Sequence, residues 1–395
     1  MPALSARRFK AFAARRFGLG RYLEHCGDGR VKPQIPARAL LWGHVIGYVL
    51  RECSYLAIEA LGRSRGRRAA GIARGFGDDA LAYFSERLDP LPTRLMLISV
   101  LRRAKRNRAF ENSRFIGLAL DGTGSCRSRK KRCELCRPRH DATRRICGYG
   151  HQLSLITVVG TGLSLPFDIE PYGPGDSEYS ASRRLLDRAT RALGIRFADY
   201  VVVDGEYATA PFLHDVCARG LHPVARLKGN LPVLFAAARG RFDALPPTAV
   251  HQIDGEKVEL WDADDFDAWK DLRWPAVRVL RYRQHRPDGS ICEAYWLTNW
   301  SKQKVGSLSL YRMAKSRWEV ENQAFNDSKT HHGLEHAAHH HPNSLLVNAL
   351  LILLAIVLER LYRLRFLRRG IHQPRSAIDF VRALRLSLAA HAAPG

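Results

Sequence analysis

The sequence predicts an α/β fold, because two short apolar runs each end in an aspartate and a helical segment carries a third acidic residue. Residues 115–121 are too short and apolar for a surface helix and precede Gly-Thr-Gly, so we expect a buried strand that ends at Asp121. Residues 200–204 repeat the pattern and end at Asp204, while Glu321 lies in a strongly helical segment. One aspartate after a strand is often only a turn cap, but the recurrence favours a shared site.

The composition indicates a basic protein with more than one domain and with its cysteines in the reduced form. Its 395 residues are enough for two or three domains, and a formal net charge of +25 favours a polyanionic partner, most simply nucleic acid. A generally cationic protein or a membrane-surface binder would share that charge. No secretory signal pattern is present, so we expect a cytoplasmic, nucleoid-associated protein. The apolar run 345–358 is shorter than the roughly 20 residues of a spanning helix, which predicts a buried helix and no membrane partner.

The N-terminal region, 1–110, is predicted to be helical and to bind DNA. It holds 22 Lys and Arg against 8 Asp and Glu, with dense clusters at 63–68 and 102–108. Amphipathic patterns cover 40–58 and 80–88. The alternative is a solvated helical face that contacts nothing.

The next region has the element order of an RNase H-like core. We expect its first part at 111–228, interrupted by a basic, cysteine-rich insert at 122–150. The predicted elements after the first strand are a hairpin, a helix, the second aspartate strand, a helix and a strand, at 153–169, 177–193, 200–204, 208–218 and 223–227. In such a core the first and fourth strands are neighbours, which would bring Asp121 and Asp204 together.

The remainder is predicted to be a β-rich insertion followed by the rest of the core. Residues 229–303 contain four strand patterns separated by turn signals such as Asp254-Gly255. Residues 304–370 should then supply the helix with Glu321 and a long apolar helix at 344–366. The tail, 371–395, is rich in Ala and Arg, and we expect part of it to be loose.

Three carboxylates from two strands and a helix suit a pair of divalent cations. Two Mg²⁺ (or Mn²⁺) ions roughly 3.5–4 Å apart need anionic oxygen ligands and a phosphate between them. One ion would activate a water or 3′-hydroxyl and the other would stabilise the leaving oxygen. We therefore expect Asp121, Asp204 and Glu321 to be metal ligands in phosphodiester chemistry.

With these residues the chain resembles the DDE transposases of bacterial insertion sequences, in the subgroup with a β-rich insertion before the catalytic Glu. The resemblance covers residues 110–366 and matches Asp121, Asp204 and Glu321 to the family's D, D and E. It implies an Mg²⁺-dependent endonuclease that cuts DNA at the element's ends and transfers the cut strand. It also implies double-stranded terminal repeats and target DNA as partners, and a homodimer on that DNA.

The family's signature around the glutamate is Y-(2)-R-(3)-E-(6)-K, and this chain fits it in part. Arg317 lies four residues before Glu321, on the same helix face, and we expect it to face the scissile phosphate. The tyrosine position holds an alanine, with Tyr311 three residues earlier. The lysine position holds Ser328, with Lys329 one place later, so Lys329 matches only if the helix is irregular. Tyr311 and Lys329 remain candidate DNA contacts.

Cysteines and tryptophans give two further predictions. Four of the eight cysteines lie in the basic insert, and Cys133 and Cys136 have zinc-knuckle spacing. A structural Zn²⁺ would take the set Cys126, Cys133, Cys136 and Cys147; the alternative is free thiols on a flexible basic insert. Trp296 and Trp300 could stack on a flipped base, as in related transposases, or could belong to the core.

Histidines follow the Glu helix in a dense group, and we expect them to be at the surface or to face DNA rather than to bind metal. The group comprises His331, His332, His336 and His339 to His341.

Two rival functions share most of these features. A DNA-binding protein descended from a transposase would have lost catalysis, although all three carboxylates are present here. An RNase H-like nuclease would keep the carboxylates but would cut DNA without joining it.

Overall fold

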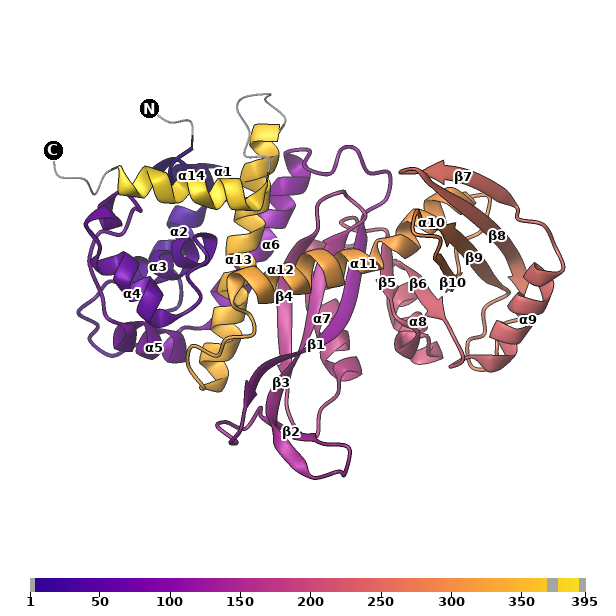
Figure 1. Ribbon diagram of the computed structural model, residues 1–395, viewed down its shortest axis with the longest axis horizontal. Coiled ribbons are helices and arrows are strands. Elements are labelled where there is room, and N and C mark those ends of the chain that lie inside the picture. Colours follow the sequence, from indigo (N-terminus) through magenta and orange to yellow (C-terminus); the bar gives the residue numbers. More distant parts are fainter. Residues whose placement is uncertain (1–3, 368–375, 391–395) are drawn as a thin grey trace.

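The computed structural model describes residues 4–367 and 376–390, and a mixed sheet of ten strands runs through its centre (Figure 1). The strand order is β2-β3-β1-β5-β6-β10-β9-β8-β7. The remaining strand, β4, also pairs with β3. The strands are β1 (Gly117–Ser128), β2 (Arg137–His140), β3 (Ile146–Val159), β4 (Leu165–Tyr172), β5 (Tyr200–Val203), β6 (His222–Leu227), β7 (Ala249–Ile253), β8 (Glu256–Phe266), β9 (Val277–His285) and β10 (Ile291–Thr298).

The described helices surround this sheet. Before β1 come α1 (Ala6–Phe17), α2 (Leu19–Glu24), α3 (Ala37–Val49), α4 (Tyr55–Arg63), the 3₁₀ turn η1 (Arg65–Arg68), α5 (Asp78–Arg87) and α6 (Pro90–Arg106). Between the strands lie α7 (Glu178–Leu193), the 3₁₀ turn η2 (Gly205–Tyr207), α8 (Ala210–Ala218) and α9 (Pro232–Asp243). After β10 come α10 (Ser307–Lys315), α11 (Arg317–Glu319), the π-helix η3 (Val320–Phe325), α12 (Asn326–His332), α13 (Pro342–Leu367) and α14 (Ala377–Ala389).

The strands β4-β3-β1-β5-β6 reproduce the predicted RNase H-like order. β1 is antiparallel to β3 and parallel to β5, and β5 is parallel to β6. Because β1 and β5 are direct neighbours, the two aspartate-bearing strands lie side by side. The α/β fold and its RNase H-like core are therefore confirmed.

The first strand is longer than its sequence indicates. The Gly-Thr-Gly after Asp121 is part of β1, where Gly122 pairs with Ser154 and Gly124 with Gln152. The expected end of the strand at Asp121 is therefore wrong, because β3 extends beside it and satisfies the backbone of these glycines. Together with β2, the outer halves of β1 and β3 form a finger that extends away from the sheet (Figure 1).

The β-rich segment after β6 is continuous with the core sheet. β10 pairs antiparallel with β6 from Tyr295–Leu227 to Thr298–Val224, so β10, β9, β8 and β7 extend the core sheet at its far edge. The segment also contains α9, which the sequence analysis missed. Proline is favourable in the first turn of a helix, and Pro232 has this position in α9, shortly after the strand-like run 223–227.

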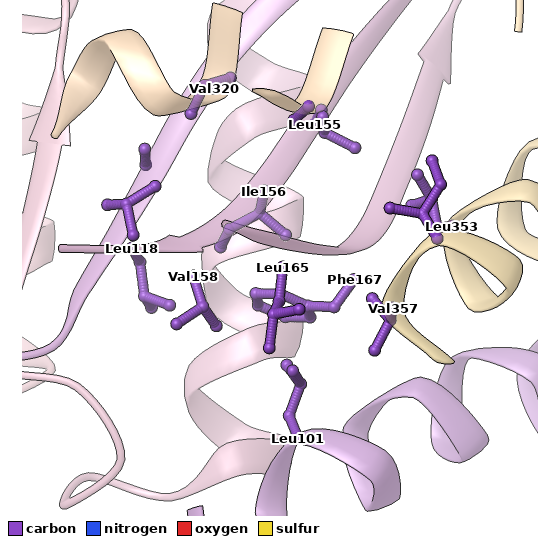
Figure 2. Close-up of a cluster of buried hydrophobic side chains, with 14 of the residues drawn as sticks. Leu101, Leu118, Leu155, Ile156, Val158, Leu165, Phe167, Val320, Leu353 and Val357 are labelled. Carbon is purple, nitrogen blue, oxygen red and sulfur yellow. The ribbon is translucent and has the colours of Figure 1, made fainter. Parts of the chain in front are cut away.

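The long apolar helix α13 lies between the N-terminal helices and the sheet and packs against both. Its residues 342–364 are apolar and long enough to cross a membrane, but 89% of that window is buried inside the protein. It packs against α3, α5 and α6 of the N-terminal helices and against β4 of the sheet. Figure 2 shows Leu353 and Val357 of α13, Leu101 of α6 and Val320 of η3 gathered around Leu155, Ile156, Leu165 and Phe167 of the strands.

The C-terminal tail is ordered where the structure describes it. Helix α14 begins at a cap in which Ser376 accepts from the backbone N–H of Asp379. Its Phe380 is fully buried against Phe9 and Tyr362. Residues 376–390 are therefore not the loose part of the tail, because the apolar face of α14 completes the N-terminal helical core. The expectation stays open for 371–375 and 391–395, which lie outside the described residues.

Candidate active site

The strand register places Asp121 and Asp204 next to each other. Ala119 on β1 pairs with Val202 on β5, and each aspartate comes two residues later, Asp121 within β1 and Asp204 directly after the end of β5. Residues two apart project to the same face, and neighbouring strands lie about 4.8 Å apart. The two carboxylates therefore share one face of the sheet at adjacent positions.

Arg317 connects Asp121 to Glu321. Its guanidinium lies 3.2 Å from an Asp121 carboxylate oxygen and 3.8 Å from a Glu321 oxygen. The Arg317 side chain is only 12% exposed, whereas that of Glu321 is 54% exposed and reaches solvent. Among the described residues, the carboxylate oxygens of Asp121, Asp204 and Glu321 do not all lie within 4.8 Å of one another. The Arg317 guanidinium lies between Asp121 and Glu321.

A fourth carboxylate, Glu178, lies beside Asp121 and was missed by the sequence analysis. Glu178 is the first residue of α7, and its carboxylate accepts hydrogen bonds from Tyr207 (2.8 Å) and Tyr172 (3.4 Å). Its carboxylate fills the space in which a Cβ at Gly122 would stand. An acidic residue in a first helical turn is explained by helix capping alone, so sequence gives no separate signal for it.

The acids differ in how readily they lose a proton. Burial raises the pKa of Asp121 to about 6; Arg317 opposes this shift, while Glu178 and Asp204 add to it. Burial also acts to raise the pKa of Asp204, but the hydrogen bond from the Lys228 ammonium at 2.8 Å outweighs it and the pKa is lowered. The two aspartates therefore differ because Asp121 is more strongly affected by burial, whereas Asp204 has an ammonium partner.

This donor set fits hard divalent cations. Mg²⁺ and Mn²⁺ prefer carboxylate oxygens, and the residues available are Asp121, Asp204, Glu321 and the nearby Glu178. The raised pKa of Asp121 reflects burial and like charges, and a bound cation would relieve the latter. None of these acids lines the cavity of about 870 Å³ that is bordered by Arg312, Arg360 and Arg363.

The helix with Glu321 has the irregularity that Lys329 requires. A π-helix, η3, runs from Val320 to Phe325, so it contains Glu321 and ends before Lys329. Each π turn closes at i+5 instead of i+4, which accommodates one extra residue. Lys329 therefore takes the angular position that an i+7 residue has on a regular helix, while Ser328 is buried and its hydroxyl bonds to the Ala324 carbonyl.

Three other predicted DNA contacts lie in the core instead. Tyr311 is 4% exposed and its ring packs edge-on against Tyr282. Trp296 is fully buried, and Trp300 stacks on His222 at 4.3 Å. The expectation of base stacking by Trp296 and Trp300, and of a DNA contact by Tyr311, is not met here because β10 and α10 turn these aromatic rings into the sheet's apolar layer.

The four insert cysteines do not form one cluster. Cys133 and Cys136 meet, with their sulfurs 3.7 Å apart. Cys147 is exposed and contacts the Arg139 carbonyl, while Cys126 is buried and faces the Leu334 carbonyl. The strand pairing of β2 with β3 separates Cys147 from the Cys-x-x-Cys turn.

Histidines after the Glu helix are not uniformly at the surface. His331 and His336 are exposed, but His332 is fully buried. Nδ1 of His332 lies 2.7 Å from the Arg51 guanidinium, which also pairs with Glu359 at 3.1 Å. The surface expectation fails for His332 because this network ties the loop after α3 to α12 and α13.

A comparison with models of protein families identifies a family for this chain. A family model described as the transposase DDE domain matches residues 113–358, well over half of the 395-residue chain. No curated protein sequence is similar enough to this chain to count as a match. Among solved structures, a piggyBac transposase synaptic complex with hairpin DNA is similar, with 11% identity and a TM-score of 0.47 over 99% of this chain and 81% of that one.

Proposed function

Since the chain belongs to the transposase DDE domain family, we propose that it cuts DNA at the ends of a mobile element and joins the cut strand to a target, with Asp121, Asp204 and Glu321 as the catalytic acids. The observation that carries this proposal is the parallel register of β1 with β5, which gives Asp121 and Asp204 equivalent positions. The ion pairs from Arg317 to Asp121 and Glu321 support the third acid.

Two Mg²⁺ or Mn²⁺ ions held by these acids would activate the attacking oxygen and stabilise the leaving oxygen. The chain's own residues prepare that site. Arg317 holds the Asp121 carboxylate and is placed to bind a phosphate oxygen once cations replace its ion pairs. Lys228 keeps Asp204 ionised, and Glu178, fixed by two tyrosines, keeps negative charge beside Asp121.

Lys329 completes the proposed phosphate-binding set. Its ammonium lies 3.4 Å from Glu335, and its side chain is 21% exposed. The extra residue of the π-helix supports a position for Lys329 on the same side of the helix as Glu321, and its partly exposed ion pair could be exchanged for a DNA phosphate. Cutting both ends of an element needs two such sites, which is the basis for proposing a homodimer on DNA.

The test uses the full-length protein, Mg²⁺ and labelled duplex DNA from the flanks of the gene. Asp121→Ala, Asp204→Ala and Glu321→Ala should each abolish cleavage while DNA binding stays within a few fold. Asp288→Ala, which removes an exposed carboxylate in the turn between β9 and β10, is the matched control and should cut normally.

The products separate the rival functions. Joined DNA supports the transposase, while cut DNA that is never joined supports a nuclease. Binding without any cut, under conditions where Asp288→Ala and the wild type behave alike, supports a catalytically inactive descendant. Full cleavage by any one of the three acid variants would refute the assignment of that acid.

A further inference from the structure

The finger contains a cluster of two thiols and an imidazole that the proposed DNA chemistry does not use. Cys133 and Cys136 lie in the turn before β2, and His151 lies on β3. The His151 Nε2 atom is 3.2 Å from the Cys133 sulfur and 3.4 Å from the Cys136 sulfur. Among the described residues, this is the group of potential metal ligands whose atoms all lie within 4.8 Å of one another.

These separations are those of ligands around a tetrahedral zinc ion. With Zn–S near 2.3 Å and Zn–N near 2.0–2.1 Å, tetrahedral angles set S···S at about 3.8 Å and S···N at about 3.6 Å. The two sulfurs are 3.7 Å apart, and both sulfur–nitrogen distances are slightly shorter than this ideal. The backbone N–H of Arg132 also points at the Cys136 sulfur at 3.5 Å, an arrangement that stabilises a thiolate.

The burial of the cluster also favours a cation. His151 is 3% exposed and Cys136 is 2% exposed. Nδ1 of His151 has no hydrogen-bond partner, so the two sulfurs supply the polar contacts that fix this ring. A buried imidazole facing two sulfurs with no oxygen partner is poorly satisfied without a metal.

The fourth ligand position points to His340. Its ring centre is 5.8 Å from that of His151, and its buried Nδ1 has no hydrogen-bond partner. Two imidazoles that bind one tetrahedral ion have ring centres about 5 Å apart, given the Zn–N length. A small movement of the loop after α12 would therefore bring His340 into the first coordination sphere.

We propose that the protein binds one structural Zn²⁺ through Cys133, Cys136, His151 and His340. This set differs from the four cysteines expected from sequence, since two histidines replace Cys126 and Cys147. It ties the finger to the loop that follows the Glu321 helix. The hydrogen bond from Ser125 to the Leu334 carbonyl, at 2.6 Å, joins the same two segments beside the site.

The consequence is a rigid, basic finger that extends from the strand on which Asp121 lies. Nine Lys and Arg lie between Arg127 and Arg145, around the zinc ligands. Strand β1 carries both Asp121 and the start of the finger, and seven residues of strand span about 23 Å. Zinc would supply the folding energy that this polar segment cannot draw from an apolar core.

The test measures metal content of full-length protein purified without chelator and with a reductant. We expect about one zinc per chain, and loss of most of it in Cys133→Ser and His151→Ala. His340→Ala should lower the zinc affinity at least tenfold, measured by competition with a chelating dye. Cys147→Ser is the matched control, because it removes a thiol from the same finger outside the cluster, and it should keep its zinc.

Cobalt substitution keeps the test independent of the folding of any variant. Co²⁺ in the wild-type site should give tetrahedral d–d bands and a charge-transfer band sized for two thiolates. Wild-type protein without zinc that also fails to bind Co²⁺ would overturn the proposal, as would equal zinc loss in Cys147→Ser. A Cys133–Cys136 disulfide in protein isolated under reductant would do the same. None of these readouts depends on DNA cleavage.

Discussion

At the scale of single residues, the two aspartates of the site are in opposite electrostatic conditions. Burial raises the pKa of Asp121 to about 6, above its value in an unfolded chain, so ionised Asp121 costs stability at neutral pH. That cost declines as the pH falls towards 4. Lys228 lowers the pKa of Asp204 despite burial, so ionised Asp204 contributes stability that is lost only at acidic pH.

Removing each charge should therefore change stability in opposite directions. Without divalent cations at pH 7.5, Asp121→Asn should raise the free energy of unfolding by roughly 1–2 kcal/mol, which allows for the partner that Arg317 loses. At pH 5 the increase in the free energy of unfolding caused by Asp121→Asn should be about half as large. Asp204→Asn should lower the free energy of unfolding by about 1 kcal/mol or less. Urea titration of both variants checks this, and equal destabilisation by both would contradict the assigned environments.

The sequence alone is enough to propose those residues of the site that belong to a recognisable local pattern. Asp121 and Asp204 each end an apolar run, and Arg317 and Glu321 share a helix face, so local rules suffice to propose them. Glu178 and Lys228 are different. Each belongs to the site only because the chain folds back onto β1 and β5, and nothing in their local sequence separates them from ordinary surface charges.

At the scale of elements, the π-helix after Arg317 supports the proposal that Lys329 acts as the signature lysine, displaced by one residue. On a regular helix, a residue seven positions later points to within about 20° of the starting direction, but a residue eight positions later points about 80° away from it. The π turn between Val320 and Phe325 absorbs the extra residue. A sequence is normally interpreted with a regular helix period. The sequence could therefore show only that Lys329 would match the signature if the helix were irregular, and not that it is irregular.

Variants of Lys329 test this geometry. Lys329→Ala should reduce cleavage roughly 100- to 1,000-fold, the effect of losing one donor to the charge that develops in the transition state, with little change in DNA binding. The double variant Ser328→Lys/Lys329→Ser restores the family spacing in sequence but should not restore activity. Ser328 is fully buried, so a lysine there would also lower the melting temperature. Recovery of cleavage in the double variant would show that Ser328 has the functional position.

Other element errors have a common cause, which is pairing between distant strands. The glycines after Asp121 read as a turn, yet β3 lies alongside and extends β1 through them. The insertion read as a separate module, yet Tyr295 to Thr298 pair with β6 and continue the sheet. Turn signals and strand patterns are local, whereas these pairings are set by the whole sheet.

At the scale of the whole molecule, the N-terminal helices and the core share one interior. Helix α13 packs against α3, α5 and α6 and also against β4, and Arg51 pairs with Glu359 on α13. Residues 1–110 therefore lack part of their own core when separated from α13. For this reason the contribution of the basic charge to DNA binding is best measured in the full-length chain.

Basic charge on the finger should contribute to the salt dependence of DNA binding. Lys and Arg contacts to phosphates release condensed counterions, so the logarithm of affinity falls with the logarithm of salt by about 0.9 per contact. Arg129, Lys130 and Lys131 are exposed at the start of the finger. Changing all three to Ala should reduce the slope by up to about 3.

A matched triple variant separates direct contact from net charge. Lys270, Arg273 and Arg286 are also exposed, but they lie on the β7–β10 half of the sheet, away from the finger. Changing them to Ala removes the same charge and should lower the slope by less than about 1, since only the general field weakens. Fluorescence anisotropy with a labelled duplex at several salt concentrations gives both slopes. Equal slopes for the two triple variants would mean that the finger touches no phosphate and that its charge acts only through the molecule's overall field.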